Sequence, residues 1–262
     1  MIRLYLMDTL VWKLLRRNRR MAAGAFFFPL LLFHAASPLE KVETRYADGP
    51  VKERYFIYKN DSGVSIKDSI YREFHPNGKV KTEIRYHDGQ EEGAVRTWYS
   101  DGTPELNCHY SNGKLDGERT GWHPNNRVKC KSRWSKGKQE GISETWFENG
   151  RLKTRGSYCS GKRCSEFRTW YENGQLHSMV SFKDGYLNGP AKWYHANGEL
   201  AIVGYHGEYG DREFLWQLYG DNGEKCAKIT YSRGIVRKKE YYAPDSVIDA
   251  MLKTVEGEGG QK

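Results

Sequence analysis

The sequence predicts an all-β protein: an elongated antiparallel β-meander of about seven hairpin repeats of 24 residues, with a short C-terminal capping helix. Two observations carry this prediction. An Asn-Gly pair, or a close relative of it, recurs at a nearly constant interval, and aromatic residues stand at two fixed positions around it. A fixed period of this length is typical of repeat architectures, in which each unit packs only against its neighbours.

The first residue of each Asn-Gly pair marks one repeat. The seven markers are 24 residues apart, or 25 in the last interval: Asn77, Asp101, Asn125, Asn149, Asn173, Asn197 and Asn222. An aromatic residue stands three places before each marker: Phe74, Trp98, Trp122, Trp146, Trp170, Tyr194 and Tyr219. A second stands nine places after six of the markers: Tyr86, Tyr110, Trp134, Tyr158, Phe182 and Tyr231. These two positions are therefore the repeating apolar sites of each unit.

Each marker is expected in a hairpin turn. Pro76 and Pro124 precede two of the markers, at a place where a type I turn requires φ near −65°. This favours a three-residue loop closed by a left-handed Gly, a position that Asn126 fills once. In that register Trp146 pairs with Leu152, so aromatic and aliphatic side chains share a face. The aromatic side chains of successive units are expected to line one face of the sheet.

The flanks of the array are less regular. VETRYADG at 42–49 repeats the aromatic, two residues, Gly pattern of RYHDG at 85–89, which predicts a degenerate first repeat or N-terminal cap over 37–70. The repeat array is expected over 71–240, and a C-terminal helix and tail over 241–262. The helix is expected to cover the last edge of the sheet. One side of it is apolar: Val247, Ile248, Met251, Leu252 and Val255.

The amino end has the pattern of a targeting segment. RRNRR at 16–20 precedes the uncharged run MAAGAFFFPLLLFHAA at 21–36, the order of a secretory signal. A membrane-spanning helix needs about 20 apolar residues, and Pro29 and His34 interrupt this shorter run. Residues 1–36 are therefore interpreted as a signal peptide, with a signal anchor as the alternative, and the chain is expected to be exported or membrane-associated.

Other interpretations of this segment stay open. Met7 or Met21 could be the true start, and a start at Met21 would remove the basic residues on which the export prediction partly depends. The run could also be a buried apolar strand or helix. The chain would then be cytoplasmic.

Charge does not favour a nucleic-acid partner. The net charge is +9, but residues 1–36 hold six basic residues against one acid, so about +4 remains on the rest. Beyond that segment acidic and basic residues are mixed along every stretch. This pattern is typical of a solvated sheet surface and not of a phosphate-binding stripe.

Units such as TWYENGQLHSMVSFKDGYLNGP resemble the MORN repeat in its Asn-Gly-containing variant, the form seen in the YwqK family of bacterial proteins assigned as antitoxins. The resemblance covers about residues 71–236. It implies an open, twisted sheet without catalytic activity that binds protein partners and, in some cases, membrane lipids. The antitoxin assignment further implies a partner toxin, which does not agree well with an export signal.

The sequence holds no catalytic signature. A phosphate-binding loop, G-x-S-x-G, H-E-x-x-H and Cys-x-x-Cys are all absent, so we predict a non-enzymatic protein without a cofactor. His75, His123 and His195 share the position two residues before their markers. They fall at least two units, roughly 19 Å, apart, so no metal site is predicted.

The five cysteines allow two interpretations. In an exported chain, Cys159 and Cys164 on either side of SGKR could close a small disulfide, and Cys108 and Cys130 lie on equivalent strands of adjacent units. The odd number leaves at least one thiol unpaired. In a reducing compartment all five, including Cys226, would be small half-buried side chains.

The repeated aromatics are expected mainly to form the core of a thin sheet. A single sheet cannot bury both faces, however, so part of them must face solvent or a partner. The candidate partner-binding residues are Trp98, Trp122, Trp146, Trp170, Tyr194, Tyr110, Trp134 and Tyr158. The leading hypothesis is an exported, non-enzymatic scaffold that binds a protein or peptide partner. An antitoxin-like protein would be one form of such a scaffold. The alternative is a binder of envelope glycan or lipid headgroups, because aromatic rings stack on sugars and basic residues attract anionic headgroups.

Overall fold

The computed structural model describes residues 38–47 and 49–259, so the predicted signal segment 1–36 lies outside the described residues. The chain divides into two compact units, Met1–Ala36 and Ser37–Lys262, and the fold below is that of the second. Within the described ranges, no helix combines the length and the hydropathy that crossing a membrane requires.

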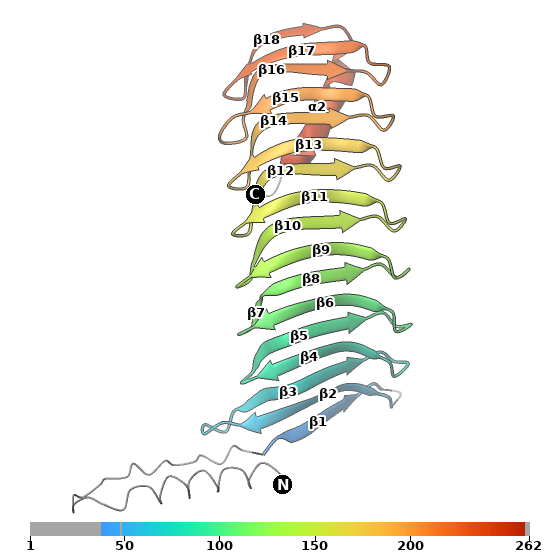
Figure 1. Ribbon diagram of the computed structural model, residues 1–262, viewed down its shortest axis with the longest axis vertical. Coiled ribbons are helices and arrows are strands. Elements are labelled where there is room, and N and C mark those ends of the chain that lie inside the picture. The colour runs from blue at the N-terminus through green and yellow to red at the C-terminus, as the bar shows by residue number, and fades with distance from the viewer. Residues whose placement is uncertain (1–37, 48, 260–262) are drawn as a thin grey trace, which may run out of the picture. The chain divides into compact units, whose positions relative to one another are not determined.

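The second unit is one antiparallel sheet in which the strands follow each other in chain order, as predicted (Figure 1). Only β7 is irregular, because β6 pairs both with this two-residue strand and with β8. The first strands are β1 (Glu40–Arg45), β2 (Val51–Lys59), β3 (Ser65–Phe74), β4 (Val80–His87), β5 (Gln90–Trp98), β6 (Pro104–Ser111), β7 (Lys114–Leu115), β8 (Gly117–Trp122) and β9 (Val128–Ser135). The others are β10 (Lys138–Trp146), β11 (Leu152–Cys159), β12 (Lys162–Trp170), β13 (Leu176–Lys183), β14 (Tyr186–Tyr194), β15 (Leu200–His206), β16 (Arg212–Tyr219), β17 (Lys225–Ser232) and β18 (Ile235–Tyr241).

The marker turns have the predicted geometry. In the first unit His75 N–H donates to Lys79 O and Gly78 N–H donates to His75 O, both at 2.8 Å, which closes a three-residue loop. Gly78 is left-handed with φ 82°, and Asn126 takes the same conformation with φ 62°. Each marker turn therefore fixes the register of the hairpin that it closes.

A one-residue bulge beside each marker turn separates the two aromatic positions. Trp146 pairs with Leu152, as predicted, but its neighbour Thr145 pairs with Thr154, so one residue of β11 is left out of the pairing. Successive side chains alternate between faces, and Tyr158 therefore lies on the face opposite Trp146. The same shift occurs in the other units. The expectation that all the aromatics line one face is wrong.

The marker asparagines connect each turn to the next one. Asn149 Oδ1 accepts from the Arg151 N–H at 2.9 Å within its own turn, while Asn149 Nδ2 donates to Glu172 O of the following turn at 3.1 Å. The same bridge runs from the other asparagines to the next turn: Asn77 to Ser100, Asn125 to Glu148, Asn173 to Ala196 and Asn197 to Asp221. Asn recurs because its amide accepts and donates at once, which Asp101 cannot do.

The histidine position forms a second ladder. His123 Nε2 lies 2.9 Å from Trp146 O, so each such side chain bonds the main chain of the next unit's first aromatic. The equivalent contacts, at 2.7–2.8 Å, are those of His75 with Trp98, Tyr99 with Trp122, Tyr171 with Tyr194 and His195 with Tyr219. The three histidines therefore have a structural role that tyrosine also fills.

The sequence pattern aligned the first hairpin with the wrong turn of the repeat, the one at 85–89. Tyr46 N–H donates to Pro50 O at 2.9 Å and Gly49 N–H donates to Tyr46 O at 3.1 Å, which are the bonds of a marker turn. Tyr46 OH also donates to Phe74 O at 2.7 Å, as the second ladder requires. Tyr46 and Gly49 are thus equivalent to His75 and Gly78, and not to Tyr86 and Gly89.

The helix α2 (Asp245–Gly259) covers a face of the sheet and not its last edge (Figure 1). Ile248 and Val255, 0% and 2% exposed, join a buried cluster with Trp193 and Trp216. Val247 is 43% exposed and so does not belong to the apolar side that was predicted. The edge strand β18 stays uncovered by α2 because the large buried side chains lie on the sheet face and not at its edge. We call the covered face, which also carries Tyr158, the helix face.

The His206 imidazole is enclosed in this core. His206 is 4% exposed and lies between Trp193 and Trp216, with ring centroids 6.5 and 5.0 Å away. Its Nδ1 bonds Gly210 O at 2.7 Å, and no group of the described residues bonds its buried Nε2. Burial lowers the pKa of His206 below 6.5, although the Gly210 carbonyl opposes this.

The bridging asparagine is expected to stabilise the sheet measurably. Asn149→Ala removes the bond within its turn and the bridge to the next turn, whereas Asn222→Ala removes no bridge, because Asn222 Nδ2 bonds Glu224 of its own turn. Urea unfolding should show Asn149→Ala to be the more destabilising by about 1 kcal/mol. Equal losses would mean that the bridge contributes nothing.

Acid should destabilise the helix face through His206. The folded state binds this proton less readily than the unfolded chain, so stability falls as pH drops through 6.5, by up to about 1.4 kcal/mol per pH unit until the folded pKa is reached. The melting temperature should therefore fall from pH 7 to pH 5. His206→Asn, whose Nδ2 takes the place of the His206 Nδ1 and can still donate to Gly210 O, should reduce that fall. An unchanged pH profile would assign the acid sensitivity to other groups.

Candidate functional site: the open face of the sheet

The face opposite α2 carries one continuous row of side chains, with one residue on each strand except β7. In order of cross-strand pairing they are Glu43, Arg54, Arg72, Glu83, Arg96, Asn107, Thr120, Lys131, Glu144, Arg155, Arg168, Met179, Lys192, Val203, Gln217, Lys228 and Glu240. Eight are basic and four are acidic, so we call them the basic row and this face the open face.

The first aromatic of each unit forms a second row on the open face, two residues further along each strand. Its members are Phe74, Trp98, Trp122, Trp146, Trp170, Tyr194 and Tyr219, all half-buried. Their cross-strand partners are Val80, Pro104, Val128, Leu152, Leu176, Leu200 and Lys225. This aromatic row therefore alternates large rings with mostly aliphatic side chains beside the basic row.

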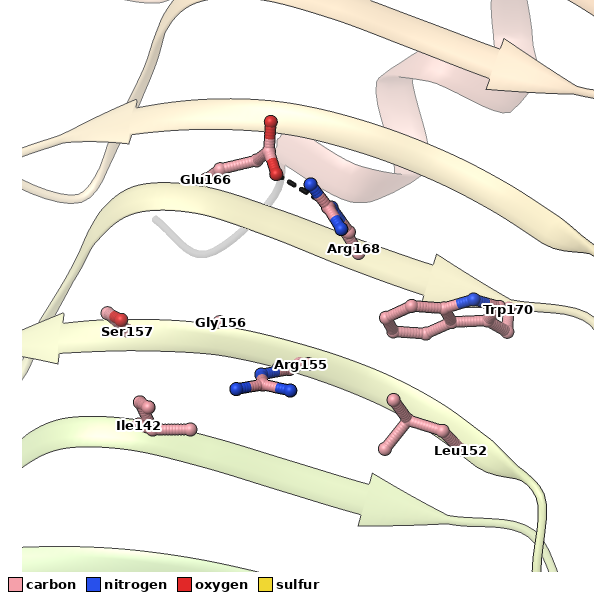
Figure 2. A pocket seen from close by; sticks show the side chains of 8 residues that line it. All are labelled: Ile142, Leu152, Arg155, Gly156, Ser157, Glu166, Arg168 and Trp170. Carbon is pink, nitrogen blue, oxygen red and sulfur yellow. Dashed lines mark hydrogen bonds and ion pairs between the residues drawn. The ribbon is translucent and has the colours of Figure 1, made fainter.

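The two rows border a shallow groove of about 480 Å³ over β10–β12 (Figure 2). Its lining residues are Ile142, Leu152, Arg155, Gly156, Ser157, Glu166, Arg168 and Trp170. A second depression of about 400 Å³ over β8–β11 shares Ile142 and Arg155 with it. Ile142 is 52% exposed and adds apolar surface to both depressions.

The groove combines apolar surface with positive charge. Arg168 Nε donates to Glu166 Oε1 at 2.7 Å, and Arg155 Nε lies 3.5 Å from Glu144 Oε1. The two arginine side chains remain 50% and 55% exposed. Ser157 is the one hydroxyl in the lining, and no histidine or cysteine accompanies it. Such a surface can stack on and pair with a ligand.

The sheet divides the predicted site residues between its two faces. Trp98, Trp122, Trp146, Trp170 and Tyr194 lie together on the open face. Tyr110, Trp134 and Tyr158 lie on the helix face, where the Tyr158 ring packs against Phe167 at 5.5 Å. The eight residues therefore cannot contact one ligand together.

The basic residues of the groove were missed in the sequence. The position five residues before each marker reads Arg72, Arg96, Thr120, Glu144, Arg168, Lys192 and Gln217, a repeating polar site. Tabulating this column would have revealed the first-strand members of the basic row. Arg155, by contrast, enters the row only because of the bulge.

The cysteines do not contribute to the groove. Cys159 and Cys164 form a disulfide across the turn between β11 and β12, with Cα atoms 5.9 Å apart. Cys108, Cys130 and Cys226 carry free thiols, so Cys108 and Cys130 are not joined. Burial raises the pKa of the Cys108 thiol and keeps it protonated.

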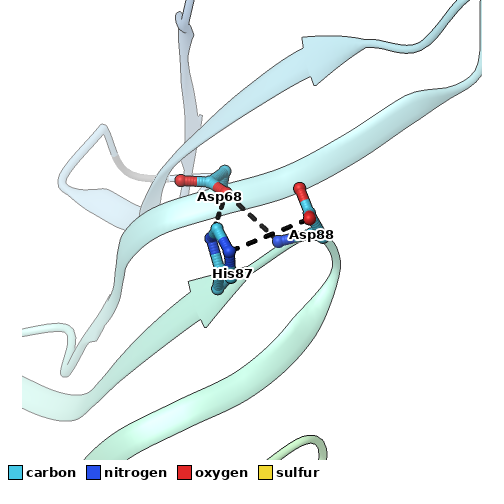
Figure 3. A group of neighbouring side chains, drawn as sticks. All are labelled: Asp68, His87 and Asp88. Carbon is cyan, nitrogen blue, oxygen red and sulfur yellow. Dashed lines mark hydrogen bonds and ion pairs between the residues drawn. The ribbon is translucent and has the colours of Figure 1, made fainter.

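One group of side chains has the composition of a metal site: Asp68, His87 and Asp88 (Figure 3). Their polar atoms already bond each other, since the Asp88 N–H donates to Asp68 Oδ2 at 3.1 Å and His87 Nδ1 lies 3.4 Å from the same oxygen. Tyr58 OH donates to Asp88 Oδ1 at 2.9 Å, which raises the pKa of Tyr58. These bonds account for the cluster, and we assign no metal to it.

A protein-family model described as "MORN repeat variant" matches the chain at four segments: 67–88, 139–160, 163–184 and 187–206. These four segments are similar to the MORN repeat variant and together make up less than half of the chain. The matched segments correspond to the hairpins β3–β4, β10–β11, β12–β13 and β14–β15, and the marker turns of the unmatched units have the same bonds. The narrower resemblance to YwqK-family antitoxins stays a prediction.

Solved structures give only distant likenesses to this chain. Chains titled "Crystal Structure of TcdB2-TccC3-Cdc42" and "Crystal Structure of TcdB2-TccC3-TEV" are 12% identical over 77% and 78% of this chain, which spans 16% of each, with TM-scores of 0.17 and 0.16. A protein of unknown function from Bacteroides fragilis NCTC 9343 is 8% identical, with 78% of this chain and 92% of that chain covered and a TM-score of 0.12. Comparison with curated proteins gives no match.

Alanine substitutions should separate the core from the open face. Trp216 is 0% exposed, so Trp216→Ala should lower the free energy of unfolding by about 3–5 kcal/mol. Trp146 is half-buried, and Trp146→Ala should cost less than half as much. Urea unfolding measures both. A cost for Trp146→Ala as large as that for Trp216→Ala would make the aromatic row part of the core.

Proposed function

We propose that this chain is a non-enzymatic scaffold that binds a protein or peptide partner on its open face. The observation that carries the proposal is the aromatic row, a line of half-buried rings beside basic side chains on a face that no element of the described residues covers. Trp, Tyr and Arg are the residues that most often anchor protein interfaces. MORN repeats are generally modules for protein or membrane interactions, which agrees with this function.

The construction of the face suits binding. Its side chains stand on strands tied together by the ladders at the turns, so little ordering is needed when a partner arrives. A standard interface buries about 800 Å² on each partner, and several neighbouring units of the open face together offer an area of that order. A partner would therefore contact several repeats at once.

Two finer forms of the proposal rest on the sequence. In the first form, the protein partner is a toxin that the open face holds inactive, as the resemblance to YwqK-family repeats suggests. Export or membrane association rests on residues 1–36, and without a functional signal the scaffold is cytoplasmic.

A glycan or lipid headgroup of the cell envelope is the second candidate ligand. The adjacency of Trp170 to Arg155 and Arg168 favours it, because rings stack on sugars while guanidinium groups attract anionic headgroups.

Site-specific photocrosslinking in the native host tests the proposed function. A photoreactive amino acid replaces Ile142 on the open face or, as a matched control, Val247 on α2, since these side chains are 52% and 43% exposed. We expect a discrete protein adduct at position 142 only, and we expect Trp146→Ala combined with Trp170→Ala to reduce it. Equal adducts at both positions, or adducts with glycan or lipid alone, would contradict protein binding.

A further inference from the structure

We propose that the groove over β10–β12 binds an acidic segment of the partner, an extended peptide rich in Asp or Glu. This inference rests on the proposed function and names the chemistry of its partner. Arg155 and Arg168 are direct cross-strand partners in the groove, and each side chain is at least half exposed. Like charges directly opposite each other destabilise a sheet, and an anion between them removes that cost.

The balance of charge around this pair is incomplete. Between β9 and β14 the basic row holds Lys131, Arg155, Arg168 and Lys192 against Glu144 alone. A carboxylate that enters the groove meets two guanidinium groups, each of which can pair with it in a planar, two-bond geometry. The exposed ion pairs already present are weak enough to be exchanged for such a contact.

A second arginine pair in the same row provides the comparison. Arg54 and Arg72 are also direct cross-strand partners, but Glu43 accepts from Arg54 Nε at 2.6 Å and Glu83 accepts from Arg72 Nε at 2.8 Å. In the groove the cross-strand acid lies further away, at 3.5 Å from Arg155, and the acid of Arg168 comes from its own strand. The Arg54 and Arg72 side chains are 38% and 39% exposed, against 55% and 50% for Arg155 and Arg168, so the groove pair is the more accessible of the two.

The distribution of acids favours a peptide over a membrane surface. Glu144 and Glu166 lie on the open face beside the two arginines, and Glu118 lines the neighbouring depression. A flat anionic bilayer would bring its headgroups against these acids as well as against the bases. An extended chain can instead direct its carboxylates to Arg155 and Arg168, and direct apolar side chains to Ile142 and Trp170.

Peptide-display selection on the full chain tests the proposal, using a library of random peptides as the probe. Peptides that bind should be enriched in Asp and Glu several-fold over the library, and their affinity should fall as salt is raised. Arg155→Gln combined with Arg168→Gln should weaken the selected peptides about tenfold, the loss of one good charge-assisted contact. Thermal unfolding confirms that this variant is folded.

The matched control is Arg54→Gln combined with Arg72→Gln. It removes the same two charges from the same row about eight strands, or roughly 38 Å, away, several Debye lengths from the groove. This control should keep the affinity within about twofold. Selected peptides without acidic enrichment, or equal losses in the two variants, would overturn the proposal. So would binding of phosphatidylglycerol vesicles through Arg155 and Arg168 without any peptide selected.

The outcomes also separate this inference from the proposed function. If the protein adduct at position 142 forms and is insensitive to Arg155→Gln with Arg168→Gln, the open face binds a protein but not through acidic groups. If no adduct forms at position 142, the proposed function itself fails.

Discussion

The one-residue bulge beside each marker turn is the constraint on which the rest of the structure depends. Without it the two aromatics of a unit would share a face, and one side of the sheet would be almost wholly apolar. With it Trp146 and Tyr158 lie on opposite sides, so each side receives one ring per unit. The chain can then cover one side with its own helix and keep a line of rings on the other.

The two ladders of hydrogen bonds at the turns hold successive units in the same register. The Asn149 amide and the His123 ring each bond the main chain of the following unit, and equivalent groups do so along most of the array. Because the strands are held at one register, residues 24 apart line up into rows. The aromatic and basic rows are thus consequences of the turn chemistry as much as of the side chains themselves.

The sequence was sufficient to predict the hairpin geometry, but not which side chains lie on the same face of the sheet. Pro76 and the spacing of the markers predicted the loop, the left-handed Asn126 and the pairing of Trp146 with Leu152. The bulge was not predictable from this pattern, because nothing local distinguishes Thr154 from its neighbours as the next partner. For that reason three of the eight candidate site residues, Tyr110, Trp134 and Tyr158, lie on the other face from the rest, and Arg155 was missed.

The sequence pattern also could not predict which surface of the sheet α2 covers. That choice depends on close packing between large and small residues. The Trp216 ring lies where a Cβ on Gly204 would come within 2.2 Å of it, and the Phe167 ring stands over Gly156 in the same way. These contacts make the last units flat and apolar enough to receive Ile248 and Val255. A list of apolar residues on the helix does not reveal which side of the sheet offers such a surface.

The restriction of α2 to the last units makes the array unequal along its length. Fifteen buried residues form the core from Phe167 to Val255, whereas earlier units are held mainly by strand pairing and the ladders. In a chain of units that contact only their neighbours, cooperativity extends as far as the coupling between units is strong. The C-terminal units are therefore expected to be the most stable part of the array, and the amino-terminal hairpins the first to open.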